Sequence, residues 1–215
     1  MIESSNGIIL RVRPLTETSL IVHWLTPDFG RIAMVARGAR RPRSPFAGNL
    51  DLFYQSDFSF SRSRKSDLHI LREVNPGQTR KELRQDMVKL RQAAYAVGFV
   101  EQTTETDTPL PAVFELISEF LDCLCRQKPT PANVFAIELK LLRELGLGPD
   151  LENVQLTTGT KQIVRTLTQK GLAMASRLKL ADAQNAELRR FLHGFLIFHL
   201  GKLPKGRAAA LGGDI

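Results

Sequence analysis

The spacing of hydrophobic residues changes once along this chain, near Asn75-Pro76-Gly77, and this change constrains the fold more than any other feature. Before that point apolar residues recur at every second position, as in strands with one buried face. After it they recur every three or four positions, as in amphipathic helices. The sequence therefore predicts an α+β protein, with a β domain over residues 1–77 and an all-α domain over residues 78–215.

Short strands separated by turn residues fill the first domain. They are expected at Ile8–Val12, Ser19–Thr26, Arg31–Arg37, Asp51–Ser61 and Leu68–Val74. Five short strands in about 75 residues are typical of a small barrel of the OB type, and an open meander is the alternative. Trp24 is expected in the core. Phe53 is expected to pack beneath a loop or against the helical half, and stacking on a base is its alternative role.

The first strand carries its apolar and basic residues on different sides. Ile8, Leu10 and Val12 share one face, which is expected to point inward. Arg11 and Arg13 then lie on the outer face.

Helix signals begin directly after the boundary. Thr79-Arg80-Lys81-Glu82 has the form of a capping box and predicts a helix start. Further helices are predicted at Pro111–Gln127, from Thr130-Pro131 to Gly146, at 161–174 and from Asp182. The helix after Pro131 is apolar on most sides and should be central. Residues 150–160 are read as a short irregular segment, and the tail from Gly201 is expected to fray.

The charge balance favours anionic partners. The formal net charge is +8 and the isoelectric point about 9.9, so phosphate polyanions come first and acidic protein segments second. The first residues contain no secretory signal pattern. No apolar run approaches the roughly 20 residues of a membrane span, so a cytoplasmic protein without membrane contact is expected.

Motifs for catalysis and for metal binding are missing from the sequence. It contains no phosphate loop, no Gly-x-Gly-x-x-Gly, no His-Glu-x-x-His and no Gly-x-Ser-x-Gly. The four histidines are scattered, and Cys123 and Cys125 point to different sides of a predicted helix. The carboxylates of the β domain are dispersed, although a two-metal nuclease needs them clustered. We therefore expect no enzyme, no cofactor and no metal, with a DNA-modifying enzyme as the least favoured alternative.

Basic residues are the most informative feature of the β domain. They lie on the outer parity of strands one and three, in the Arg-Pro-rich loop after strand three, and in the loop before strand five. Arginine predominates among them, and its planar fork suits bidentate contact with phosphate oxygens. The candidate DNA-binding residues are Arg11, Arg13, Arg31, Arg37, Arg40, Arg41, Arg43, Arg62, Arg64 and Lys65. A merely solubilising basic loop is the alternative.

Several stretches resemble a known family. Gly7–Ser44 is similar to the start of the bacterial DNA repair protein RecO, with matching elements at Arg13-Pro14, Glu17-Thr18-Ser19, Thr26 with Gly30, and Gly38–Ser44. Phe135–Leu151 is similar to the central helix of that family and its glycine-rich end, and His199–Arg207 to its C-terminal element. Two departures stand out. Many relatives bind zinc through Cys-x-x-Cys pairs where Glu152–Gly159 has no cysteine, and Gly206 replaces a usual serine.

The resemblance implies a recombination mediator without catalytic activity. Such a protein binds single- and double-stranded DNA, anneals complementary strands, and works with RecR to load RecA onto DNA coated by single-stranded DNA-binding protein. Family members also dock the acidic C-terminal tail of that coating protein. In this chain the candidate residues for tail docking are Leu139, Lys140, Leu142 and Arg143. An adaptor that binds acidic protein tails and touches DNA only incidentally is the alternative function.

Overall fold

The computed structural model of the protein describes residues 2–213, and the chain divides into two compact units. The first, here called the barrel unit, contains Met1–Arg80 and Thr104–Ser118. The second, the helical unit, contains Lys81–Thr103 and Glu119–Ile215. The division differs from a single cut near residue 77, because the chain returns to the barrel unit at residues 104–118.

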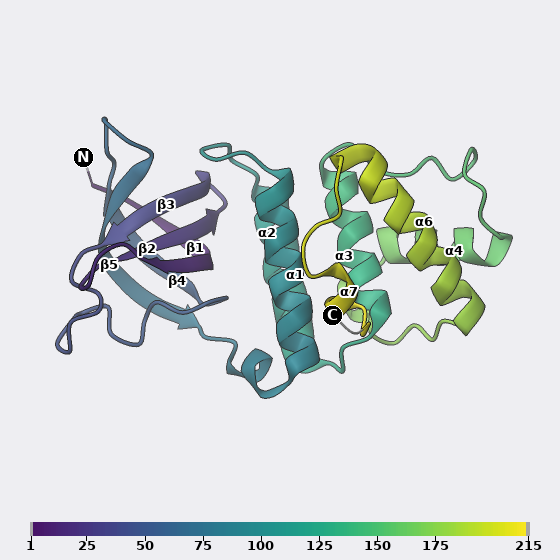
Figure 1. Cartoon of the computed structure of the whole chain (residues 1–215), viewed down its shortest axis with the longest axis horizontal. Helices are drawn as coiled ribbons and strands as arrows, with labels where there is room; N and C mark the ends of the chain where they lie inside the picture. Colours follow the sequence, from purple (N-terminus) through teal and green to yellow (C-terminus); the bar gives the residue numbers. More distant parts are fainter. Residues whose placement is uncertain (1, 214–215) are drawn as a thin grey trace. The chain divides into compact units, whose positions relative to one another are not determined.

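The barrel unit is built on five strands: β1 (Ile2–Pro14), β2 (Leu20–Thr26), β3 (Gly30–Ala36), β4 (Gln55–Ser61) and β5 (Leu68–Gln78) (Figure 1). They close into a barrel in the order β1-β2-β3-β5-β4. Only β3 and β5 pair in parallel, and the other neighbours are antiparallel. The predicted OB-type barrel followed by a helical region is confirmed, and the open meander is wrong.

The prediction of which β1 side chains point into the barrel core was wrong. Its pairing with β2 shifts register between Ile9 and Arg11, as at a β-bulge. Ile9 and Val12 therefore both contact the barrel core, while Ile8 and Leu10 are buried outside that cluster. After the bulge Arg11 pairs with His23 and Arg13 with Ile21, so the two arginines still belong to the outer face.

Aromatic side chains fill the barrel core. The Trp24 ring lies 4.4 Å from that of Phe58, which lies 6.0 Å from Phe60. Trp24 is completely buried, as expected. Phe53 is only 2% exposed, so it packs inside the protein and cannot stack on a base.

Residues 104–108, here called the strap, run along the start of β3. Thr106 forms an isolated parallel bridge with Arg31, and the Asp107 amide donates to the Arg31 carbonyl at 3.0 Å. The strap thus covers backbone of β3 that β5 does not reach, because the β3–β5 pairing begins at Ala33. Gly30 lies under it with φ +64°, and a Cβ built there would come within 1.8 Å of the Thr108 carbonyl oxygen.

Two of the predicted helices differ from the structure in their bounds. The chain after Thr79 does not enter an α-helix directly, because Lys81–Gln85 forms a 3-10 turn (η1) first. The first α-helix starts at Met87, where the Asp86 carboxylate accepts from the Val88 amide at 2.8 Å. The predicted helix at 161–174 is two helices, Thr158–Gln169 and Leu172–Ala175.

The helices of the chain are α1 (Met87–Thr103), α2 (Pro111–Arg126), α3 (Pro131–Glu144), α4 (Thr158–Gln169), α5 (Leu172–Ala175), α6 (Asp182–Leu200) and α7 (Arg207–Ala210) (Figure 1). α3 is the central helix, as predicted, since ten of its fourteen residues are buried. No helix among residues 2–213 has the length and apolar character needed to cross a membrane.

The tail after Gly201 does not fray up to residue 213, and residues 214–215 lie outside the described part. It ends in α7, whose Arg207 is 5% exposed and makes a double hydrogen bond with the fully buried Glu138 carboxylate, at 2.6 and 3.0 Å. The Tyr95 hydroxyl donates to the same carboxylate at 2.5 Å. Burial, together with the Glu138 charge, holds the pKa of Tyr95 well above its usual range, so Tyr95 keeps its proton. The sequence pattern missed this docking because its principal anchor is a buried ion pair.

Candidate nucleic-acid interface

The Arg-Pro-rich segment after β3 is a chain of turns fastened to the β1–β2 loop. The Arg40 amide donates to the Thr18 carbonyl, and the Arg40 guanidinium to the Thr16 carbonyl, both at 3.0 Å. Ala39 and Phe46 are buried in the barrel core and anchor the segment from below. Gly38, at φ +69°, makes the turn that directs the chain back toward this loop. The arginines are therefore presented from a held backbone.

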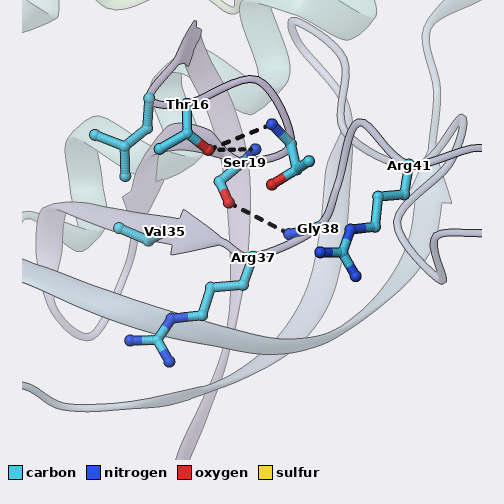
Figure 2. A pocket seen from close by; sticks show the side chains of 8 residues that line it. Thr16, Ser19, Val35, Arg37, Gly38 and Arg41 are labelled. Atoms are coloured by element: carbon cyan, nitrogen blue, oxygen red, sulfur yellow. Dashed lines mark hydrogen bonds between the residues drawn. The ribbon is translucent and has the colours of Figure 1, made fainter.

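A surface pocket of about 480 Å³ lies between these two segments, and we call it the loop pocket. Figure 2 shows Arg37 and Arg41 on one part of its wall and Thr16 and Ser19 on another. The complete lining is Leu15, Thr16, Thr18, Ser19, Val35, Arg37, Gly38 and Arg41. No acidic residue lines the loop pocket, so its electrostatic character is cationic.

Two rows of outward residues run from β1 across β2 and β3 to β5. Val22 and Met34 point into the core, so their neighbours along each strand point out. One row is Arg13, Ile21, Val35 and Ile70, and the other is Arg11, His23, Ala33 and Leu68. All of these except the exposed Arg13 are half-buried. We call these rows the outer face; the alternation of β3 predicted its part of this face, whereas the β2 sequence is apolar at neighbouring positions and gave no such signal.

In the loop between β4 and β5, one of the three basic candidates is already paired. The Arg62 Nε lies 3.0 Å from Glu3 Oε1, and its Nη1 lies 3.8 Å from Asp107 Oδ1. The hydrogen bond from Arg62 to Glu3 raises the pKa of the guanidinium. Arg64 and Lys65 are exposed and make no side-chain ion pair within residues 2–213. Arg62 thus has an internal structural role, whereas its two neighbours face solvent.

His69 lies beside this ion pair and is almost completely buried. Its Nδ1 accepts from the Ser63 amide at 3.3 Å, and its ring stacks on Phe60 with the centroids 5.4 Å apart. Burial, and then the positive charge of Arg62, lowers the pKa of His69. The neutral imidazole is therefore part of the support of the β4–β5 loop.

Arg31 is separated from the other candidates by its partners. Its Nε donates to the Thr104 hydroxyl at 2.8 Å, and its Nη2 donates to the Thr104 carbonyl. The sequence could not reveal this, because Thr104 is far away along the chain. Arg31 fastens the strap and does not join the loop pocket.

The other basic candidates are accessible. Arg13, Arg37, Arg40, Arg41 and Arg43 are exposed, and Arg11 is half-buried on the outer face. Among the described residues, no acidic side chain forms an ion pair with Arg13, Arg37, Arg41 or Arg43. The structure thus gathers Arg37, Arg40 and Arg41 at the β1–β2 loop, and none of the three has an ion-pair partner among residues 2–213.

The predicted tail-docking residues of α3 do not form an exposed groove. Leu139 and Leu142 are completely buried in the helical unit. Lys140 Nζ and Arg143 Nη1 both donate to the Thr168 carbonyl, at 3.2 and 3.3 Å, near the end of α4. Burial lowers the pKa of Lys140. An all-round apolar helix offered no sequence signal to separate buried from accessible leucines.

No three His, Cys, Asp or Glu side chains within residues 2–213 are grouped so that they would hold a metal ion. The segment 150–160, predicted to be irregular, is held by side-chain hydrogen bonds. Glu187 accepts from the Thr157 amide and hydroxyl, each at 2.8 Å, and from the Thr160 hydroxyl. The hydrogen bond from Thr160 and those from Thr157 lower the pKa of Glu187.

Comparison with known proteins gives a consistent result over most of the chain. Residues 1–80 match the family model "Recombination protein O N terminal", and residues 84–154 match "Recombination protein O C terminal". The DNA repair protein RecO of Bacillus pumilus (strain SAFR-032) is 30% identical over 211 residues, covering 94% of this chain and 81% of the relative. That of Anaeromyxobacter sp. (strain K) is 29% identical and covers 91% of each chain. That of Bacillus subtilis (strain 168) is 31% identical over 71% of this chain and 59% of its own. With its barrel, its helical region and these matches, the chain belongs to the RecO family of DNA repair and recombination proteins.

Proposed function

We propose that this protein binds DNA through the barrel unit, by contacts to the sugar-phosphate backbone. The observation that carries the proposal is the set of accessible arginines Arg37, Arg41 and Arg43, which follow β3 and have no ion-pair partner within residues 2–213. They border the outer face, and OB-folds bind oligonucleotides on the β2–β3 face and its flanking loops. Arg64 and Lys65 lie in one of these flanking loops, the one between β4 and β5.

Binding by this surface is expected to be tolerant of DNA sequence. The outer face contains aliphatic residues and one histidine, His23, but no Phe, Tyr or Trp on which bases would stack. The larger part of the affinity then comes from phosphate neutralisation and counterion release, which do not depend on base identity. The same contacts are available on single and on double strands.

The test replaces Arg37, Arg41 and Arg43 together by alanine and measures binding to a fluorescent oligonucleotide across a salt series. We expect affinity to fall roughly 10- to 100-fold at low salt, and the slope of log K against log salt to flatten by about three units, if each arginine neutralises one phosphate. The intrinsic fluorescence of Trp24, the only tryptophan, reports whether the barrel remains folded.

The matched control removes the same charge elsewhere. Lys128, Arg177 and Lys179 are exposed side chains of the helical unit, and their triple alanine variant also loses three positive charges. It should retain most of the affinity and the slope. Equal losses in both triple variants would mean that only net charge matters, and the proposal would be wrong.

Family membership supports a finer proposal. The protein acts without catalysis as a mediator that anneals complementary strands and, with RecR, helps RecA load onto DNA coated by single-stranded DNA-binding protein, in the cytoplasm at the nucleoid. For docking the acidic tail of the coating protein, the helical unit offers Phe198 and Ile197, which are 83% and 41% exposed on α6, with Lys202 following. This surface replaces the buried leucines of α3 as the candidate.

Strand annealing on coated DNA tests the finer proposal. The annealing rate is expected to fall severalfold when the coating protein lacks its acidic tail, because docking raises the local concentration of this chain on the DNA. Bare strands, which carry no coating protein, should also be annealed, because no docking is then needed. An adaptor that only binds acidic tails predicts the opposite pattern: an acidic peptide ending in Phe would be captured, yet bare strands would not be annealed at all.

A further inference from the structure

The loop pocket presents hydrogen-bond donors and has few acceptors. Thr16 Oγ1 already accepts from the Thr18 and Ser19 amides, at 3.3 and 3.1 Å. Ser19 Oγ accepts from the Gly38 amide at 3.4 Å (Figure 2). Because both hydroxyl oxygens are engaged as acceptors, their hydrogens remain to be donated. Such a wall is complementary to an anion that is rich in acceptor oxygens.

The guanidinium groups add charge to these donors. Arg37 and Arg41 line the loop pocket, and neither makes a side-chain hydrogen bond or ion pair within residues 2–213. Arg40 does not line the loop pocket; its Nη1 donates to the carbonyl of Thr16, which does. Each guanidinium of the lining pair can grip two oxygens of one phosphate in a bidentate contact. The two guanidinium groups and the two hydroxyls together offer more hydrogen-bond donors than a DNA phosphodiester has free oxygens.

A phosphate monoester matches this donor set better than the interior of a DNA strand. Its three terminal oxygens carry about −1.5 to −2 charges near neutral pH, whereas an internal diester exposes only two oxygens with a single charge. The volume, about 480 Å³, lies within the range of roughly 300–1,000 Å³ of small-ligand sites. It therefore suits one nucleotide-sized group.

The other residues that line the loop pocket indicate which chemical group carries the phosphate monoester. Leu15, 45% exposed at the loop tip, and Val35 from the outer face give the loop pocket an apolar side. A sugar or a base can pack there while the phosphate meets the arginines. We propose that the loop pocket binds the phosphorylated end of a DNA strand. This inference rests on the proposed function, since it places one end of the bound strand beside the outer face.

The experiment compares oligonucleotides of one sequence that carry a 5′-phosphate, a 3′-phosphate or hydroxyls at both ends. We expect one phosphorylated form to bind about tenfold more tightly than the hydroxyl form, the size of one added set of charged hydrogen bonds. Which end is preferred distinguishes the two sources of a terminal phosphate. A deoxynucleoside monophosphate should compete for the preferred end better than inorganic phosphate does, because only the nucleotide reaches Leu15 and Val35.

Variants locate the effect in the loop pocket. Arg37→Ala and Arg41→Ala should each weaken binding of the hydroxyl form by the loss of one backbone contact, and should weaken binding of the preferred phosphorylated form further, so that most of the end preference disappears. Arg64→Ala, on the loop before β5, should weaken binding of all three oligonucleotides alike and keep the preference. The fluorescence of Trp24 shows that each variant retains a folded barrel.

The two proposals fail in different ways. Tight binding of all three oligonucleotides with equal affinity overturns the end-binding inference and leaves the proposed function standing. A preference that survives in both pocket variants also overturns it, because the phosphorylated end would then bind elsewhere. Absence of binding to any oligonucleotide overturns both proposals.

Discussion

Arg207→Ala is expected to lower the free energy of unfolding of the helical unit by about 3–5 kcal/mol, the usual cost of removing one partner from a buried ion pair. Glu138 has no exposed surface, and without Arg207 its carboxylate would stay buried with the neutral Tyr95 hydroxyl as its side-chain donor. The tail also loses its anchor, so the hydrogen bonds from Gln92 to the Ala210 carbonyl and from Arg189 to the Leu211 carbonyl are weakened. Chemical denaturation followed by far-UV circular dichroism measures the loss.

Two companion variants separate the causes. Lys205→Ala removes an exposed charge two positions earlier and should change stability by less than about 0.5 kcal/mol. The double variant Glu138→Gln with Arg207→Met removes both charges, so it should be more stable than Arg207→Ala alone. If Arg207→Ala costs less than about 1 kcal/mol, the buried pair does not hold the tail in the way described.

Gly30→Ala is the second substitution with a large expected effect. It should destabilise the barrel unit by roughly 2–5 kcal/mol, because a left-handed backbone and steric overlap add together. The new Cβ would come 1.8 Å from the Thr108 carbonyl oxygen, so the strap must move away from β3. Denaturation followed by Trp24 fluorescence measures the effect, and hydrogen exchange of the Asp107 amide reports directly on release of the strap.

Gly48 provides the matched control. It lies in the same unit at φ +77°, but a Cβ there meets nothing within 4 Å. Gly48→Ala should therefore cost only about 1–2 kcal/mol, the penalty of the left-handed conformation alone. Equal costs at the two positions would show that the strap yields freely, contrary to the expected result.

Strands and helices that depend on local sequence signals were predicted well. The strands β2 to β5 and the helices α2 and α3 were found near their expected places, because alternation, turn residues and Thr130-Pro131 are local signals. The errors arose from irregular backbone. A bulge after Ile9 changed which apolar residues of β1 enter the core. The chain after Thr79 also took a 3-10 turn before its first α-helix.

The candidate interface was predicted only as a list of charges. The sequence located the arginines but could not tell that Arg31 fastens the strap or that Arg62 pairs with Glu3 and Asp107. These partners lie far away along the chain. The hydroxyls of Thr16 and Ser19 carried no signal of their own, because their role depends on Gly38 arriving beside them after β3.

The return of residues 104–118 to the barrel unit affects when this unit can finish folding during synthesis. Arg80 donates to Ser118 Oγ at 3.1 Å, and Arg31 donates to the Thr104 hydroxyl. All five strands are therefore synthesised before the residues of 104–118 that contact the barrel unit. All of α1 must be synthesised in between. During translation the edge of β3 therefore stays uncovered until the strap, residues 104–108, has been synthesised.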